Sequence, residues 1–120
     1  MAWEATIESE PASKANSRRA VLIGGKPRFI KSKKAMQYCK DFETQIQFLR
    51  PKKMFEGDVT VHIRIWYASR RPDLDDSLIL DLLQGHVYAN DRQVKERHIY
   101  WMGVDKQRPR CEIVVERREG

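Results

Sequence analysis

The clearest pattern in the chain lies between Asp58 and Ala68, where apolar residues alternate with Thr60, His62, Arg64 and Trp66. The apolar positions of this run are Val59, Val61, Ile63, Ile65 and Tyr67. Successive side chains of a strand point to opposite faces of a sheet, so this period predicts a strand with one buried face. The other face carries His62 and Arg64. A solvent-facing role is the favoured interpretation of His62, with metal ligation as the alternative.

A helical period governs the segment from Ser32 to Leu49. Its apolar residues recur at spacings of four, three, four and three: Ala35, Cys39, Phe42, Ile46 and Leu49. Ser32 is a suitable N-cap, and the helix should end before Pro51 because the residue preceding a proline disfavours helix. The pattern predicts an amphipathic helix that buries the thiol of Cys39.

Gly24-Gly25-Lys26-Pro27 is a turn signal flanked by two short segments, Val21–Ile23 and Arg28–Ile30. It predicts a small hairpin that follows a loop over Pro11–Arg19. Asp75 is placed to cap a second helix through Leu83, with Gly85 as its stop. The apolar side of this helix is predicted to hold Leu78, Ile79, Leu82 and Leu83.

Three further strands are expected at Trp3–Ser9, about Val94–Met102 and Arg110–Glu116, with a turn around Asn90-Asp91 before the second of them. The predicted order is strand, hairpin, helix, strand, helix, strand, strand. Helices interspersed among strands predict an α+β fold, a mixed sheet with two helices packed on it. At 120 residues the chain is expected to form one domain, 1–120, that includes a basic loop and hairpin region at about 11–34.

Basic charge is concentrated near the N-terminus. Net charge is +6, and residues 11–40 hold nine Lys or Arg and no Asp or Glu. These basic residues are Lys14, Arg18, Arg19, Lys26, Arg28, Lys31, Lys33, Lys34 and Lys40. Such a block often forms a solvated, mobile arm, but the interleaved apolar residues favour a folded basic surface that follows the phosphates of a nucleic acid.

Cysteine content and the N-terminus bear on location. Cys39 and Cys111 have no CxxC spacing, which argues against a zinc framework or a disulfide scaffold and fits a reducing cytosol. The first residues lack the basic start and apolar run of a signal peptide, and no apolar stretch approaches membrane-spanning length. We therefore expect a cytoplasmic protein with no membrane partner.

A cluster of carboxylates is the candidate chemistry. Asp73, Asp75 and Asp76 follow an arginine pair, Arg70 and Arg71, and Asp91 comes later in the chain. Magnesium prefers hard oxygen ligands and is usually held by one or two carboxylates plus substrate phosphate. The arginines are suited to clamp phosphate and to offset the acidic charge. This pattern favours a divalent metal held against a phosphodiester.

Structural roles are the alternative for the same acids. An Asp at a helix start caps the helix or complements its dipole, and Asp91 beside Asn90 is ordinary turn chemistry. One cap accounts for Asp75 and one dipole partner for Asp76, but neither accounts for Asp73 and Asp91 as well. Asp81 is assigned to solvent.

In these residues the sequence resembles the RusA family of Holliday junction resolvases. That family has an arginine-preceded Asp-Leu-Asp-Asn at a helix start, which Arg71-Pro72-Asp73-Leu74-Asp75-Asp76 matches. A short helix, an acidic turn and Gln-Val follow in the family, and the segment 82–94, ending in Asn90-Asp91-Arg92-Gln93-Val94, matches these. The two motifs stand at the separation that the family shows.

The resemblance implies an endonuclease that uses Mg²⁺, with Mn²⁺ as a substitute, and nicks two strands of a four-way junction as a homodimer. It implies metal-binding, catalytic roles for Asp73, Asp75 and Asp91, with Asp76 as a further candidate ligand. Two departures stand out. Asp76 replaces the usual Asn, and Ile79 replaces a lysine that is placed to stabilise charge in the transition state. Lys95 and Arg71 are the candidate substitutes for that lysine.

Three functions are therefore weighed. The first is a metal-dependent, structure-selective endonuclease that resolves Holliday junctions, with branched DNA as partner. Its expected DNA contacts are Lys14, Arg18, Arg19, Lys26, Arg28, Lys31, Lys33, Lys34, Arg70, Arg71 and Lys95. The second is a branched-DNA-binding protein whose nuclease site is disabled by Ile79. The third is a nucleic-acid-binding module without nuclease ancestry, in which Trp66, Tyr100 or Trp101 stacks on bases.

Overall fold

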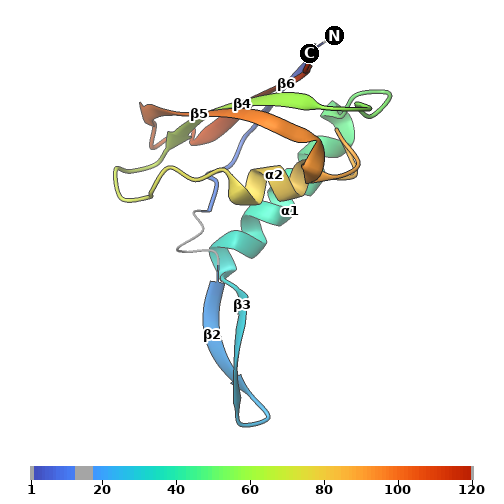
Figure 1. The fold of residues 1–120 in the computed structure, drawn as a ribbon. Coiled ribbons are helices and arrows are strands. Elements are labelled where there is room, and N and C mark those ends of the chain that lie inside the picture. The colour runs from blue at the N-terminus through green and yellow to red at the C-terminus, as the bar shows by residue number, and fades with distance from the viewer. Residues whose placement is uncertain (1, 13–17, 120) are drawn as a thin grey trace.

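A four-stranded mixed sheet forms the body of the protein (Figure 1). The computed structural model describes residues 2–12 and 18–119, and it describes only the backbone of 18–23 and 26–31. The strands are β1 (Ala2–Ile7), β4 (Val59–Tyr67), β5 (Val94–Val104) and β6 (Arg110–Arg117), in the order β1-β6-β4-β5. β6 is antiparallel to β1 and β4, whereas β4 and β5 are parallel. This confirms the predicted α+β class.

The alternation in β4 sets the core. All five odd-numbered side chains, Val59, Val61, Ile63, Ile65 and Tyr67, have no exposed surface. They lie beside Cys111, Ile113 and Val115 of β6, which are also buried. The helices pack against this side of the sheet and leave its other face open (Figure 1). The predicted strand is confirmed with its ends shortened by one residue each.

The helix α1 (Lys33–Leu49) begins where Ser32 caps it, since the Ser32 hydroxyl accepts a hydrogen bond from the Ala35 amide at 3.2 Å. The prediction of its buried face was partly wrong. Tyr38 lies in the core and Cys39 is only half-buried, while Leu49 is exposed. Residues three and four positions after Ala35 lie near the same face of the helix, so either Tyr38 or Cys39 can face the core. Tyr38 does so, and its hydroxyl lies 3.4 Å from Cys111 Sγ.

The two cysteines should differ sharply in reactivity. Cys111 is fully buried, and burial raises the pKa of its thiol to about 12, whereas Cys39 is half-buried on α1. Because the thiolate is the reactive form, we expect Ellman's reagent at about pH 8 to titrate Cys39 in the native protein and both thiols in denaturant. Cys39→Ser should remove the native signal. Rapid labelling of Cys111 in that variant would contradict this core assignment.

The same pKa shift predicts alkaline destabilisation. The folded-state pKa of Cys111, about 12, lies above the unfolded value of about 8.5. The folded chain therefore favours the neutral Cys111 thiol, and the stability of the fold is unaffected by this group below the unfolded pKa. As the pH rises from the unfolded to the folded pKa, the thiol ionises in the unfolded chain only, and the free energy of unfolding falls.

The hairpin is larger than predicted. Strands β2 (Arg18–Ile23) and β3 (Lys26–Lys31) pair antiparallel in a separate two-stranded sheet that projects from the start of α1 (Figure 1). Arg18 and Arg19 thus belong to a strand and not to the predicted loop. Gly24 and Gly25 form the turn with φ of 60° and 78°, a left-handed conformation that glycine adopts without steric cost.

A crossover joins the parallel strands β4 and β5. It contains the short helix α2 (Ser77–Leu83) and a 3-10 turn, η2 (Asp91–Gln93). Ile79 and Leu83 are fully buried as predicted, but Leu80 is buried in place of Leu78 and Leu82, which are half-buried. Residues 73–76, here called the acidic segment, precede α2 and Asp91 follows it, so this crossover positions the candidate site. Neither helix in the described part of the chain is long and apolar enough to cross a membrane.

Candidate active site

Tyr67 anchors the acidic segment to the end of β4. Its hydroxyl donates to the Asp73 carbonyl at 3.1 Å and accepts from the Asp75 amide at 3.4 Å. Burial raises the pKa of Tyr67 to about 12, so the hydroxyl keeps its proton and its donor role at neutral pH. The backbone of 73–75 is thereby fixed, while the side chain of Asp73 is exposed.

Asp75 organises the start of α2. Its Oδ1 accepts hydrogen bonds from the Ser77 amide at 2.9 Å and from the Ser77 hydroxyl at 2.6 Å. Asp75 was predicted to be the N-cap of this helix, but Asp76 occupies the N-cap position, without a side-chain cap bond, and Asp75 instead forms a turn with Ser77 one residue earlier.

Asp76 is the buried acid of the cluster. Its side chain is only 5% exposed, its Oδ1 lies 3.7 Å from the Arg97 guanidinium, and its Oδ2 is buried without a hydrogen-bond partner in the described residues. Burial raises the pKa of Asp76 above its ordinary value, Arg97 opposes this, and the neighbouring Asp75 adds to it. An oxygen left unpaired in this way costs free energy unless a proton or a cation joins it.

Asp91 lies beyond the other end of α2. The Asn90 side chain accepts from the Arg92 amide and Gln93 closes a capping box, which fixes the turn. The Asp91 amide donates to Gln84 Oε1 at 2.9 Å, tying this turn to the end of α2. The Asp91 side chain is exposed and lines a hollow with Lys95 and Arg97.

Asp73, Asp75 and Asp76 precede α2 in the chain, and Asp91 follows it. The described residues contain no group of three or more His, Cys, Asp or Glu arranged to hold a metal ion. Arg97 links the two sides, because it approaches Asp76 and shares a hollow with Asp91.

The basic residues predicted to bind DNA differ in how much of their structure is described and in whether their side chains are ion-paired. Lys14 lies outside the described residues, and only the backbone is described for Arg18, Arg19, Lys26, Arg28 and Lys31, all in the hairpin. Lys33, Arg70, Arg71 and Lys95 are exposed, whereas Lys34 is ion-paired with Glu10. Arg97 was missed by sequence reasoning, because only the tertiary fold places it beside Asp76.

The open face of the sheet is poorly suited to a polyanion. The strand registers place four glutamates on it: Glu4, Glu96, Glu112 and Glu116. His62, predicted to face solvent, is half-buried there, stacks on His98 at 5.0 Å between ring centroids, and contacts Glu116 at 3.1 Å. Phosphates are therefore expected on the helix side of the sheet, where the aspartate cluster lies.

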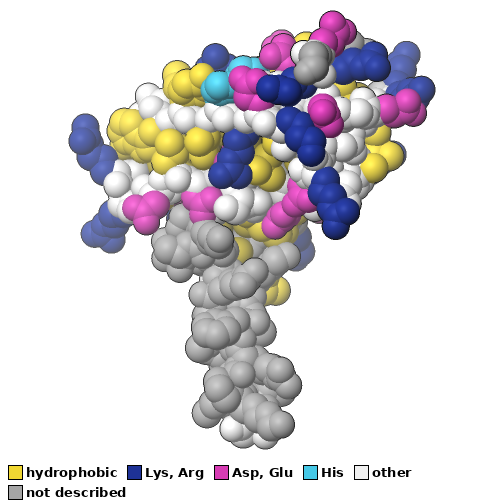
Figure 2. Space-filling model, in the orientation of Figure 1, with side chains coloured by type: hydrophobic (Ala, Val, Ile, Leu, Met, Phe, Trp, Pro, Cys, Tyr) yellow, Lys and Arg dark blue, Asp and Glu magenta, His cyan; other side chains and the backbone are white. Residues whose placement is uncertain are grey.

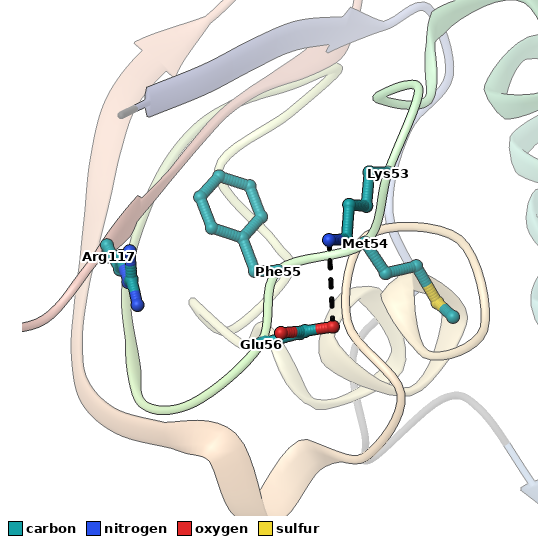
Figure 3. A pocket seen from close by; sticks show the side chains of 5 residues that line it. All are labelled: Lys53, Met54, Phe55, Glu56 and Arg117. Atoms are coloured by element: carbon teal, nitrogen blue, oxygen red, sulfur yellow. Dashed lines mark ion pairs between the residues drawn. The ribbon is translucent and has the colours of Figure 1, made fainter.

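A second hollow lies beside the loop that precedes β4. Lys53, Met54, Phe55, Glu56 and Arg117 line it, and Lys53 and Glu56 form a well-exposed ion pair at 3.8 Å (Figure 3). It contains none of the aspartates discussed above. The amide of Gln93 donates to the carbonyls of Phe55 and Gly57, so this loop serves to brace the turn that carries Asp91.

A comparison with protein-family models identifies a family for this chain. The family model for endodeoxyribonuclease RusA matches residues 8–116, which is nearly the whole chain. No curated protein was found to match. The matched region contains every aspartate of the candidate site and both helices. This chain therefore belongs to the RusA family of endodeoxyribonucleases.

Proposed function

We propose that this protein is a Mg²⁺-dependent endonuclease that resolves Holliday junctions by paired nicks. Family membership implies the resolvase nuclease activity and binding of branched DNA. The observation that supports metal dependence is the unpaired, buried Oδ2 of Asp76 beside Asp75, on the segment that Tyr67 fixes. The proposed metal-binding and catalytic acids are Asp73, Asp75 and Asp91, with Asp76 as an additional ligand.

The donor chemistry fits a hard divalent cation. All four candidate side chains offer carboxylate oxygens, and Mg²⁺ is commonly held by one or two carboxylates together with water and substrate phosphate. A site of that kind does not require three protein acids in one group. When bound, the metal would supply an activated water and neutralise charge on the phosphate. Mn²⁺ is expected to substitute for it.

The cations of the site have separate roles. Lys95 and Arg97 lie beside Asp91, so they are placed to stabilise negative charge that develops on the phosphate. They take the role of the lysine that is absent at Ile79, which is fully buried. Arg70 and Arg71 are exposed next to the acidic segment and are suited to bind the phosphates of the junction arms.

A metal-binding experiment tests this proposal without relying on cleavage. We expect Mn²⁺ to bind the wild-type chain in isothermal calorimetry and Asp75→Asn to weaken binding by about tenfold or more, because a charged ligand is lost while an oxygen acceptor for Ser77 remains. Asp81→Asn, on the exposed side of α2, is the matched control and should bind normally. Absence of Mn²⁺ binding by the wild type, with or without DNA, would reject the metal site.

DNA binding should depend steeply on salt. Each phosphate contact contributes about 0.9 to the slope of log affinity against log salt concentration. We expect the double variant Arg70→Gln, Arg71→Gln to reduce this slope by roughly 2 in fluorescence anisotropy with a four-way junction. Arg64→Gln, on the glutamate-bearing face, should leave the slope unchanged. A larger effect from Arg64 would place the DNA on the wrong side of the sheet.

The alternative function is a branched-DNA-binding protein with a disabled nuclease site. Ile79, where the family usually has lysine, is the observation that favours it. Tight junction binding without nicking would support this alternative. The proposed enzyme is a homodimer, because paired symmetric nicks call for a twofold enzyme. Its proposed location is the cytosol of a bacterial host, where a resolvase reaches its DNA.

A further inference from the structure

Three aromatic residues are candidates for stacking on bases, and the fold separates them by face. Trp66 and Tyr100 lie on the open face of the sheet. The Arg110 guanidinium lies over the Trp66 ring, 4.0 Å from its centroid, and Arg64 lies 5.5 Å from the centroid of the Tyr100 ring. The four glutamates of this face disfavour DNA there. Trp101, the third candidate, lies on the other face.

Trp101 presents its ring on the helix face of β5, which is an edge strand of the sheet within the described residues. Its partner in β4 is Ile65, whose side chain is fully buried on that face, and paired residues of neighbouring strands point the same way. Trp101 is nevertheless 41% exposed. Figure 2 shows hydrophobic atoms in a band along the near side of the molecule, over the left half of β5, with basic side chains at its left end. A large aromatic surface is therefore open to solvent on the side that holds the aspartates.

Cations lie near this aromatic ring. The Arg70 guanidinium is 5.9 Å from the centroid of the Trp101 ring. Arg97 is on the same face of β5, four residues earlier, and lies 3.7 Å from Asp76. At about 3.3 Å per strand residue, Trp101 is about 13 Å along β5 from Arg97, which is roughly the rise of four stacked nucleotides. One DNA strand can therefore reach both the ring and the acidic segment.

The chemistry of this surface fits a nucleotide with an exposed base. An indole beside a guanidinium matches a flat base and a charged phosphate, whereas an apolar protein segment would leave the charge of Arg70 without an anion. In a continuous duplex the neighbouring pairs cover both faces of each base, so stacking on a side chain first requires costly unstacking. Bases at the crossover of a four-way junction, where helices are interrupted, open most easily. A stacking residue therefore favours branched DNA.

We propose that Trp101 stacks on a base exposed at the crossover of the junction while Arg70 binds the adjoining phosphate, so that the pair selects branched over linear DNA. The inference rests on the proposed function and deepens it, because it names a residue that sets structure selectivity. The nicked phosphate then lies within about four nucleotides of the stacked base.

Fluorescence anisotropy in EDTA tests this role without nuclease activity. We expect Trp101→Ala to weaken binding to a four-way junction by about 5- to 150-fold, the loss that follows removal of one stacking aromatic residue, and to leave binding to a linear duplex unchanged. Trp101→Phe should recover most of the lost affinity. Tyr100→Ala is the matched control, because Tyr100 is 43% exposed on the open face, and it should bind the junction as the wild type does.

The outcomes separate this inference from the proposed function. Equal junction affinity in the wild type and Trp101→Ala, or an equal loss from Tyr100→Ala, would overturn the inference alone. A wild type that binds the junction no better than the duplex would overturn both. A lower mass of Trp101→Ala in light scattering, together with its loss of binding, would assign the ring to a protein interface and overturn the inference.

Indole fluorescence covers the case in which Trp101→Ala fails to fold. The chain has three tryptophans, and stacking on a base quenches indole emission. A saturating junction should therefore quench the wild type more than a saturating duplex does. Trp101→Phe should bind the junction without this extra quenching, whereas Trp66→Phe should retain it. Identical quenching of the wild type and Trp101→Phe would contradict stacking at Trp101.

Discussion

Asp73→Asn is expected to abolish junction nicking while leaving junction binding intact. The Asp73 side chain is exposed, and the Asp73 atom that Tyr67 holds is the backbone carbonyl, which asparagine retains. The substitution therefore removes a charged oxygen without disturbing the acidic segment. Changes in groups that only support a metal ligand cost about 10–100-fold, so loss of a direct ligand should lower the nicking rate by more than about 100-fold.

The matched control for Asp73 is Asp81→Asn. Asp81 is exposed on α2 and carries the same charge, but it lies outside the acidic segment. Nicking by this variant should match the wild type in denaturing gels, and both variants should bind the junction with wild-type affinity. If Asp73→Asn lost binding and nicking together with its fold intact, the division between catalytic acids and binding cations would be wrong.

Ile79→Lys should destabilise the protein strongly. Ile79 has no exposed surface and packs within the core cluster, so a lysine there places an ammonium group among apolar side chains. Burial of an unpaired charge of this kind costs on the order of 3–5 kcal/mol in the free energy of unfolding. The loss should appear as a lower midpoint in urea denaturation.

Asp81→Lys places a lysine on the exposed side of the same helix and separates the effect of burial from that of residue type. It should change the free energy of unfolding by no more than about 0.5 kcal/mol. If Ile79→Lys instead folded stably and gained metal-dependent nicking that the wild type lacks, the disabled-site alternative would be correct. The lysine would then reach the site from this position.

The periodic elements of the fold could be predicted from sequence. The alternation in β4 and the Ser32 cap of α1 are local signals, and the structure agrees with both. The burial of Cys39 was predicted wrongly because Tyr38 lies near the same face of the helix. Tyr38 is the residue that faces the core, where its hydroxyl contacts the Cys111 thiol of β6. That partner is 73 residues away, beyond the range of any local pattern.

The candidate site was only partly predictable for the same reason. Motif spacing made Asp73, Asp75 and Asp91 candidates, but it did not predict the burial of Asp76 or its approach to Arg97, which come from the tertiary contact between the start of α2 and β5. The position of β5 at the sheet edge was equally hidden, because strand order does not follow from the order of elements in the chain. Trp101 could therefore be recognised as part of an open edge only in the folded structure.

The most direct test of the central claim is nicking of a labelled four-way junction by the purified protein, with Mg²⁺, with Mn²⁺ or with EDTA. We expect paired, symmetric nicks that require either metal and disappear with EDTA and with Asp73→Asn. Nicking that persists in EDTA, or tight junction binding without any nicks at either metal, would contradict it.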